Sequence, residues 1–429
     1  MFVQEIRSNI ILDNNILYFD YTASGLAYQK IEDKILKVLK TYANTHSEVS
    51  SNALKTNEYY ENARKSLHKI LKAGDDFYVL PCGTGTTGSI KRFQELLGLY
   101  IPPITRKRLG IDIDKSMLPL VLVGPYEHHS NEVSFREALC ELIRIPLDEN
   151  DVIDVKALEE ILEANKGREI IASFNVASNV TGILSDYKSI YRLVKSYNGI
   201  IALDGATASP HMDIDSNFYD ALFLSPHKLL GGVGSSGILV IRKELCKDNI
   251  IPTFAGGGTV EYVSRTTQTY NADFEKREDA GTPGIIQFIK ASLAYELRDE
   301  IGLENIVRIE NELKYYFGSH VKKMKNVELY CDHVQEKLPI FSLNIKNINP
   351  YAATEILSKK YGIQVRAGCN CAGPYGHDLM GLKDDDNILL KPGWIRITLH
   401  FTHTKEDIDK LLRAIFDIAD DAGKIKSVI

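Results

Sequence analysis

Short apolar runs alternate with helical patterns through the middle of the chain, and this alternation restricts the possible folds more than any other feature. Four runs have the length and composition of buried strands: Ile170–Phe174, Ile200–Leu203, Ala221–Leu224 and Gly237–Ile241. Helical patterns over residues 157–164 and 188–196 separate some of them. Strands that alternate with helices predict an α/β fold with a mostly parallel sheet covered by helices on both faces. Because ligands bind beyond the carboxyl ends of such strands, functional residues are expected directly after each run.

The pattern changes after Pro283. Long helical stretches at 285–300 and 302–316 are followed by short strands at 340–345 and 394–399 and by a final helix at 405–420. A chain of 429 residues is too long for one hydrophobic core, so two domains are expected. We expect a large α/β domain over residues 26–285, and a small α+β domain formed by residues 1–25 and 286–429.

Composition narrows the range of partners and compartments. The net charge of −6 gives no electrostatic reason to expect nucleic acid or an acidic membrane as a partner. The start of the chain lacks the basic and apolar regions of a signal peptide, and apolar runs such as 118–123 are too short to cross a bilayer. Six mostly scattered cysteines do not form a disulfide framework. A cytoplasmic location is therefore expected.

Two strand ends carry an acid and a lysine. Asp204 follows one apolar run, and Lys228 follows another within Ser225-Pro226-His227-Lys228. A lysine can form a Schiff base with an aldehyde cofactor, and a carboxylate can keep the ring nitrogen of that cofactor protonated. Taken alone, the lysine is more often a surface residue and the aspartate more often a helix cap. The pair therefore needs support from other segments.

Three further segments supply that support. Residues 82–88, Cys-Gly-Thr-Gly-Thr-Thr-Gly, lie between a strand-like run and a helical pattern, where backbone N–H groups can bind a phosphate. His128 follows another apolar run and is suited to stack on a heteroaromatic ring. Asn179, in Ser-Asn-Val-Thr-Gly, carries an amide that can donate to a phenolate oxygen. Taken alone, residues 82–88 and the Asn179 segment are ordinary turns and His128 is a structural or surface histidine, whereas together they suit one ligand.

With these motifs the chain resembles class V aminotransferase-fold enzymes of fold type I, specifically the cysteine desulfurase and selenocysteine lyase branch. The resemblance runs from Tyr18 to Arg396. Its most specific motif is Ser225-Pro226-His227-Lys228 with the glycines after it; Glu127-His128-His129, Asp204-Gly205-Ala206 and Ala280-Gly281-Thr282-Pro283 also match. The resemblance implies a large domain with a seven-stranded, mostly parallel sheet between helices and a smaller α+β domain at the C-terminal end.

The resemblance also implies pyridoxal 5'-phosphate as the cofactor and assigns its contacts. Lys228 would bind the aldehyde, Asp204 would pair with the pyridine nitrogen, and His128 would stack on the ring. Asn179 would lie near the phenolic oxygen. The phosphate would be held by Thr86, Thr87, Ser225 and His227.

Other implied contacts involve the substrate and a second subunit. Arg396 matches the arginine that binds the substrate carboxylate, a task that suits its planar bidentate donors. His46 and Arg366 are further candidates for substrate contact. Thr282 would reach the cofactor phosphate of a partner subunit, because these enzymes are typically homodimers. One position departs from the family pattern: Thr207 replaces the usual glutamine near the phenolic oxygen, so the cofactor's electronic properties and affinity are expected to differ.

The segment from Arg366 to Pro374 resembles the desulfurase loop pattern Arg-x-Gly-x-x-Cys, which makes Cys371 the candidate nucleophile. A thiolate is the competent form for attack on the substrate sulfur. Cys369 adds a Gly-Cys-x-Cys pattern that is also similar to molybdenum cofactor sulfurases. Three other interpretations remain open: a metal site with His377, although its spacing is unusual and a fourth ligand is not apparent, a strained disulfide, and inert thiols.

The leading hypothesis is removal of sulfur or selenium from L-cysteine or L-selenocysteine, giving alanine and a persulfide on Cys371. One alternative is another class V enzyme, such as a transaminase, an epimerase or a C–S lyase, that uses no protein thiol. A third is a non-catalytic scaffold or sulfur-relay subunit. We expect a small amino-acid substrate, a homodimer and a sulfur-acceptor protein as partners. No bound metal, nucleic acid or membrane is expected.

Overall fold

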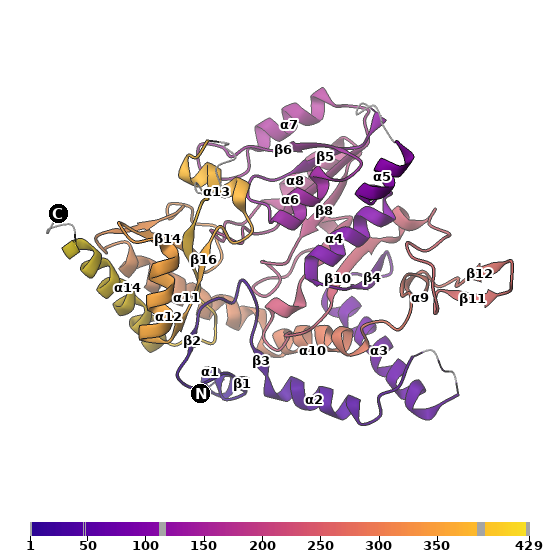
Figure 1. Ribbon diagram of the computed structural model, residues 1–429, viewed down its shortest axis with the longest axis horizontal. Coiled ribbons are helices and arrows are strands. Elements are labelled where there is room, and N and C mark those ends of the chain that lie inside the picture. The colour runs from indigo at the N-terminus through magenta and orange to yellow at the C-terminus, as the bar shows by residue number, and fades with distance from the viewer. Residues whose placement is uncertain (1, 46, 48, 111–116, 384–390, 426–429) are drawn as a thin grey trace.

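A seven-stranded sheet forms the centre of the computed structural model, which describes residues 2–45, 47, 49–110, 117–383 and 391–425 (Figure 1). The strand order is β4 (Phe77–Cys82), β10 (Gly237–Arg242), β9 (Ala221–Leu224), β8 (Ile200–Asp204), β7 (Ile170–Asn175), β5 (Leu120–Val123) and β6 (Glu141–Arg144). Strands β9, β8, β7, β5 and β6 are parallel, and β10 is antiparallel to both of its neighbours. The expected mostly parallel sheet is confirmed.

Helices cover both faces of this sheet because its strands are apolar on both sides. In β10, Leu239 and Ile241 face the cluster that contains α4 (Gly85–Leu96) and α6 (His129–Arg136). Ile238 and Val240 belong to the larger cluster on the opposite face. That cluster includes residues of α2 (Gln29–Leu39), α3 (Ser51–Ile70), α7 (Val155–Ala164), α8 (Tyr187–Ser196) and α10 (Ile285–Ile301).

A second, antiparallel sheet is built from the C-terminal part of the chain. Its order is β13 (Val327–Leu329), β14 (Ile340–Ile345), β17 (Trp394–Thr398) and β16 (Arg366–Gly368). It shares a core with α11 (Leu303–Val321), α12 (Pro350–Tyr361) and α14 (Lys405–Ile425), which lie together on the left of Figure 1. Phe19 is fully buried in this core, so the N-terminal segment packs with the C-terminal part. The proposed division into two domains stays a prediction.

Smaller elements connect these layers. β2 (Leu17–Tyr18) pairs with β15 (Ile363–Gln364), and β1 (Ile10–Ile11) pairs with β3 (Ala27–Tyr28). The remaining elements among the described residues are α1 (Phe2–Arg7), α5 (Pro103–Leu109), the hairpin β11 (Val260–Val263) and β12 (Gln268–Tyr270), α9 (Phe274–Glu278), α13 (Gly373–Met380) and the 3-10 helices Ser216–Phe218, Pro226–Lys228 and Lys243–Cys246. Within the described residues, no helix combines the length and apolar character needed to cross a membrane.

Candidate active site

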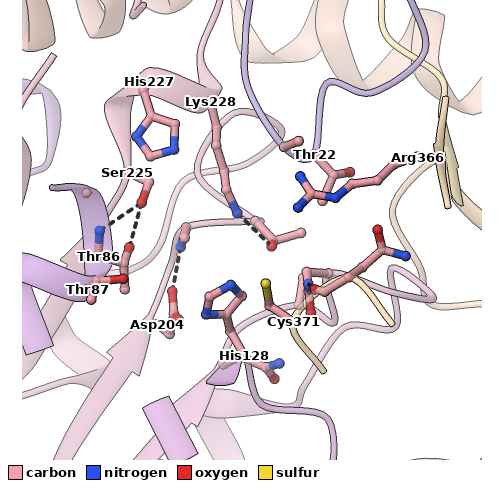
Figure 2. Close-up of a pocket in the computed structure, with 18 of the residues that line it drawn as sticks. Thr22, Thr86, Thr87, His128, Asp204, Ser225, His227, Lys228, Arg366 and Cys371 are labelled. Atoms are coloured by element: carbon pink, nitrogen blue, oxygen red, sulfur yellow. Dashed lines mark hydrogen bonds between the residues drawn. The ribbon is translucent and has the colours of Figure 1, made fainter. Parts of the chain in front are cut away.

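A cavity lies at the carboxyl ends of the parallel strands, and side chains of the second sheet line its other side. The structure brings these residues of the sequence analysis together around it: Thr86, Thr87, His128, Asn179, Asp204, Thr207, Ser225, His227, Lys228, Arg366, Cys371 and Arg396 (Figure 2). Thr282 is exposed and does not line the cavity of its own chain. His46 lies outside the described residues.

Lys228 ends a 3-10 turn, Pro226–Lys228, directly after β9, and its side chain points into the cavity (Figure 2). Close backbone packing fixes this turn: a Cβ on Gly232 would lie 1.9 Å from the Pro226 oxygen. The Lys228 amine lies 3.5 Å from the hydroxyl of Thr207. Burial, opposed by the negative charge of Asp204, lowers the pKa of Lys228 to about 8. The Lys228 amine therefore loses its proton more readily near neutral pH than an ordinary lysine does.

Asp204 is the last residue of β8 and is buried beneath the cavity. Its Oδ1 accepts a hydrogen bond from the backbone N–H of Ala206 over 2.9 Å. Burial raises the pKa of the Asp204 carboxyl above its ordinary value. A buried carboxylate of this kind favours a cationic or N–H donor in the cavity.

The start of α4 forms a narrow corner of the cavity. The Thr86 N–H donates to Ser225 Oγ over 2.8 Å, and the two hydroxyls lie 2.9 Å apart. Gly85 has φ +54°, and a Cβ there would lie 2.8 Å from both Ser225 Oγ and His227 Cε1. Thr87 extends the row of hydroxyl groups, with its Oγ1 2.7 Å from Ser130 Oγ. Hydroxyls at a helix N-terminus are suited to bind an anion.

His128 caps α6 and faces the cavity. Its Nδ1 accepts from the Ser130 N–H over 3.1 Å. Burial, with the charge of Lys228 adding to it, lowers the pKa of His128 to about 3. The ring is therefore neutral and carries its proton on Nε2. The ring and the thiol of Cys371 both line the cavity (Figure 2).

The sequence analysis quoted Glu127 only as part of a matching motif and gave it no role, whereas in the structure it holds the loop that carries His128. The carboxylate of Glu127 is buried and accepts from the Gly124 N–H, the Asn175 N–H and the Asn131 amide over 3.2, 2.9 and 2.8 Å. Burial raises its pKa to about 8. The position of Glu127 between a strand end and His128 is the sequence feature that could have identified its role.

Two other lining residues, Asn175 and Thr22, also escaped the sequence analysis. Asn175 is the last residue of β7 and lines the cavity as the strand-end rule predicts. The Thr22 hydroxyl lies 2.7 Å from that of Thr398 on β17. The N-terminal segment therefore contributes one wall of the cavity.

Arg396 and Arg366 face each other across the antiparallel strands β17 and β16. The side chain of Arg396 is buried, and it donates to Asp20 Oδ1 over 2.8 Å and to the Asn179 backbone oxygen over 3.0 Å. Burial lowers the pKa of Arg396, and Asp20 opposes this effect. Two guanidinium groups give this side of the cavity a preference for an anion.

The Asn179 amide makes a contact that the sequence analysis did not predict. Its Nδ2 donates to the Asn370 backbone oxygen over 2.7 Å, which joins the loop after β7 to the cysteine loop. The Oδ1 of Asn179 is buried without a hydrogen-bond partner among the described residues. A role for Asn179 at the cofactor stays a prediction.

The two neighbouring cysteines have different surroundings. Cys371 lines the cavity, whereas Cys369 packs against the large hydrophobic core. Both are free thiols. Within the described part of the chain, no three His, Cys, Asp or Glu side chains are grouped as a metal site requires. Of the two thiols, Cys371 is therefore the one placed to meet a ligand.

Comparisons with known proteins agree with this geometry. Probable cysteine desulfurases of Staphylococcus aureus strain Mu50 and Staphylococcus epidermidis strain ATCC 12228 are each 27% identical to the chain, over 428 and 419 residues. The alignments cover 96% and 94% of this chain and 95% and 92% of those proteins.

Solved structures share the fold. The apo cysteine desulfurase of Thermococcus onnurineus NA1 superposes with a TM-score of 0.81 at 24% identity, covering 97% of this chain and 98% of that one. The Escherichia coli cysteine desulfurase CsdA gives 0.76 at 22% identity, covering 99% and 98%. The aminotransferase class-V family model matches residues 17–411. The chain therefore belongs to the class-V aminotransferase family and is a pyridoxal 5'-phosphate-dependent enzyme of fold type I.

Proposed function

We propose that this enzyme is a cysteine desulfurase, which takes sulfur or selenium from L-cysteine or L-selenocysteine and leaves alanine and a persulfide on Cys371. The observation that carries the proposal is the presence of the Cys371 thiol in the same cavity as Lys228 and Asp204. Class V enzymes that use no protein thiol have no need of a cysteine at this place.

The cavity fits pyridoxal 5'-phosphate in three respects. The corner at Gly85, which a Cβ would fill, presents the Thr86 and Ser225 hydroxyls to a phosphate. Asp204 offers a buried carboxylate to a protonated ring nitrogen. Lys228 offers an amine whose pKa of about 8 leaves part of it neutral and nucleophilic. When bound, the cofactor supplies an electron sink for negative charge at the substrate Cα.

Arg396 and Lys228 would bind and activate the substrate. Arg396, held by Asp20 and the Asn179 backbone, would bind the substrate carboxylate with its remaining donors. Lys228 would hold the cofactor, and its amine would move the proton at the substrate Cα. His128 is neutral, so its ring can stack on the cofactor without adding a positive charge.

Cys371 would then accept the sulfur. Its thiolate attacks the sulfur of the substrate, an S–S bond forms, and the C–S bond breaks with its electron pair going to the substrate Cβ. A proton on that carbon completes alanine. Cysteine and a protein thiol thus yield alanine and a persulfide without an outside oxidant or reductant. A sulfur-acceptor protein would take the persulfide sulfur in the next step.

A homodimer is part of the proposal. Thr282 is exposed and does not line the cavity of its own chain, and its hydroxyl accepts a hydrogen bond from the Asn44 amide over 2.8 Å. This placement supports a contact with the cofactor phosphate of a partner subunit. We also propose a cytoplasmic location.

The test compares two single variants of the purified enzyme loaded with pyridoxal 5'-phosphate. Cys371→Ala should abolish persulfide formation from L-cysteine, whereas the matched Cys369→Ala variant should retain most of it. Alanine and protein persulfide are measured together by mass spectrometry. Absence of both products with the wild-type protein, or full activity of Cys371→Ala, would reject the proposal.

Turnover of other amino acids without a persulfide would favour a thiol-independent class V enzyme. Borohydride treatment that leaves Lys228 unlabelled would favour a scaffold.

A further inference from the structure

Among the described residues, three hydrogen bonds attach the cysteine loop (366–374) to segments that follow strands of the large sheet, and His129 makes two of them. The backbone N–H of His129 donates to the Cys371 oxygen over 2.7 Å. The ring Nε2 of His129 accepts from the Gly373 N–H over 2.8 Å. The third bond runs from the Asn179 amide to the Asn370 oxygen. His129 therefore binds the backbone on both sides of Ala372, at Cys371 and at Gly373.

The loop needs such contacts because its backbone is strained. Asn370 and Cys371 have φ values of +52° and +59°, in the left-handed region that residues with a Cβ rarely occupy. Conformations of this kind persist only where surrounding contacts impose them. Within the loop, the Asn370 amide donates to the Gly368 oxygen and the Ala372 N–H to the Cys369 oxygen. The bonds from His129 add an anchor outside the loop.

The anchor itself is rigid. His129 is the first residue of α6 and follows the loop that Glu127 holds with three hydrogen bonds. The preceding residue, His128, uses its Nδ1 to cap the same helix. The start of α6 therefore provides a point of attachment outside the loop that carries Cys371.

The hydrogen bond to Gly373 depends on the protonation of the His129 ring and on the space beside residue 373. Burial lowers the pKa of His129, so at neutral pH the ring is neutral and Nε2 has a lone pair to accept the Gly373 proton. Glu132 and Arg136 are the charged groups that act on the ring, with opposite signs. A Cβ on residue 373 would lie 3.1 Å from Nε2, so a glycine lets the ring approach the backbone closely.

We propose that His129 is a positioning residue that holds the Cys371 thiol at the cavity through its hydrogen bond to the Gly373 N–H. The thiol is thereby kept where it can attack the substrate sulfur. The inference deepens the proposed desulfurase function and rests on it for the catalytic consequence. The structural consequence, an anchored loop, holds whatever the substrate is.

The test uses His129→Ala, which removes the acceptor, and His129→Gln, whose side-chain oxygen can replace it. His320→Ala, an exposed histidine on α11, serves as the matched control. Iodoacetamide labelling of Cys371 is followed by fragment-ion mass spectrometry, which separates it from Cys369. Hydrogen exchange of the segment that contains Gly373 is measured on the same proteins. All are prepared as the full chain loaded with cofactor.

Loss of one hydrogen bond of ordinary net strength should increase both the labelling rate and the exchange rate about fivefold in His129→Ala. His129→Gln should return both rates toward those of the wild type, and His320→Ala should change neither. With L-cysteine, His129→Ala should lower kcat about fivefold and leave KM unchanged, because Arg396 and Lys228 are not touched.

Unchanged labelling and exchange in His129→Ala would overturn the inference, and so would a glutamine variant that behaves like alanine. A raised KM with an unchanged kcat would also contradict it, because that result describes a substrate contact. If the wild-type protein does not act on L-cysteine, the proposed function fails, while labelling and exchange still decide whether His129 anchors the loop.

Discussion

The buried guanidinium of Arg396 lies 2.8 Å from the carboxylate of Asp20. Arg396 is 3% exposed and Asp20 is 17% exposed, so water screens this ion pair weakly. Asp20 comes from the N-terminal segment and Arg396 from β17, 376 residues later in the chain. An internal carboxylate therefore partly neutralises Arg396, the arginine that we propose binds the substrate carboxylate.

Removal of Asp20 should destabilise the fold. Asp20→Ala leaves the Arg396 charge buried without its partner, and the free energy of unfolding should fall by about 3 kcal/mol. Asp20→Asn should cost less because the amide oxygen still accepts the hydrogen bond. Urea unfolding followed by circular dichroism measures both values.

The exposed ion pair between Arg308 and Glu312 on α11 gives the matched control. Glu312→Ala should cost much less than Asp20→Ala because water and salt screen that pair. Equal losses in the two variants would show that the Asp20–Arg396 pair adds no stability of its own.

Thr207 should contribute to cofactor affinity through its hydroxyl. This hydroxyl lines the cavity and lies 3.5 Å from the Lys228 amine. Thr207→Val keeps the shape and removes the polar group, so the Kd for pyridoxal 5'-phosphate should rise about fivefold, the value of one hydrogen bond. Absorbance titration of the cofactor-free protein measures it. Thr207→Ser should bind like the wild type, and a valine variant with unchanged Kd would exclude a role for the hydroxyl.

The large sheet and the strand-end residues were predictable from local patterns. Ala221–Leu224 and Ile340–Ile345 are strands with the predicted ends, because short runs made mostly of apolar residues are typical of buried strands. Asp204 and Lys228 follow such runs. Because parallel strands end at one edge of the sheet, it could be predicted that these two residues lie close together. The partly exposed strand β6, Glu141–Arg144, was missed because its charged ends give no such signal.

The contacts between distant segments could not be predicted in the same way. No local sequence pattern predicts that Asp20 pairs with Arg396 or that the His129 ring accepts a hydrogen bond from the Gly373 N–H. Both contacts depend on how the second sheet docks on the first, and that geometry is a property of the tertiary fold. The different surroundings of Cys369 and Cys371 also depend on loop dihedrals that their spacing leaves undetermined.

The phosphate corner should not tolerate a side chain at Gly85. Gly85→Ala places a Cβ 2.8 Å from Ser225 Oγ and His227 Cε1, so those groups must move. The Kd for pyridoxal 5'-phosphate should therefore rise at least about tenfold, because a misplaced phosphate contact loses a charge-assisted hydrogen bond. Titration of the cofactor-free variant measures the change.

Gly98→Ala separates crowding from backbone strain. Gly98 has φ +69°, similar to the +54° of Gly85, and a Cβ there meets no atom within 4 Å. Both variants carry the strain of a left-handed alanine, but only Gly85→Ala fills the cavity corner. Equal cofactor affinities in the two variants would contradict a phosphate site at Gly85.

The rate of cofactor uptake should follow the protonation of Lys228. Burial lowers the pKa of this amine to about 8, and only the neutral amine attacks an aldehyde. The rate constant for uptake of pyridoxal 5'-phosphate by the cofactor-free protein should therefore rise with pH and level off above pH 8. Stopped-flow absorbance at constant ionic strength records this profile.

Removal of a positive charge near Lys228 tests the direction in which the pKa of its amine moves. Arg366 helps to lower the pKa of Lys228, so Arg366→Gln should raise this pKa and move the uptake profile to higher pH. Arg366 is exposed, which makes the substitution compatible with folding. Arg308→Gln, the same change on the exposed face of α11, should leave the profile in place. A shift of the Arg366→Gln profile to lower pH, or equal shifts in both variants, would show that another group limits the reaction.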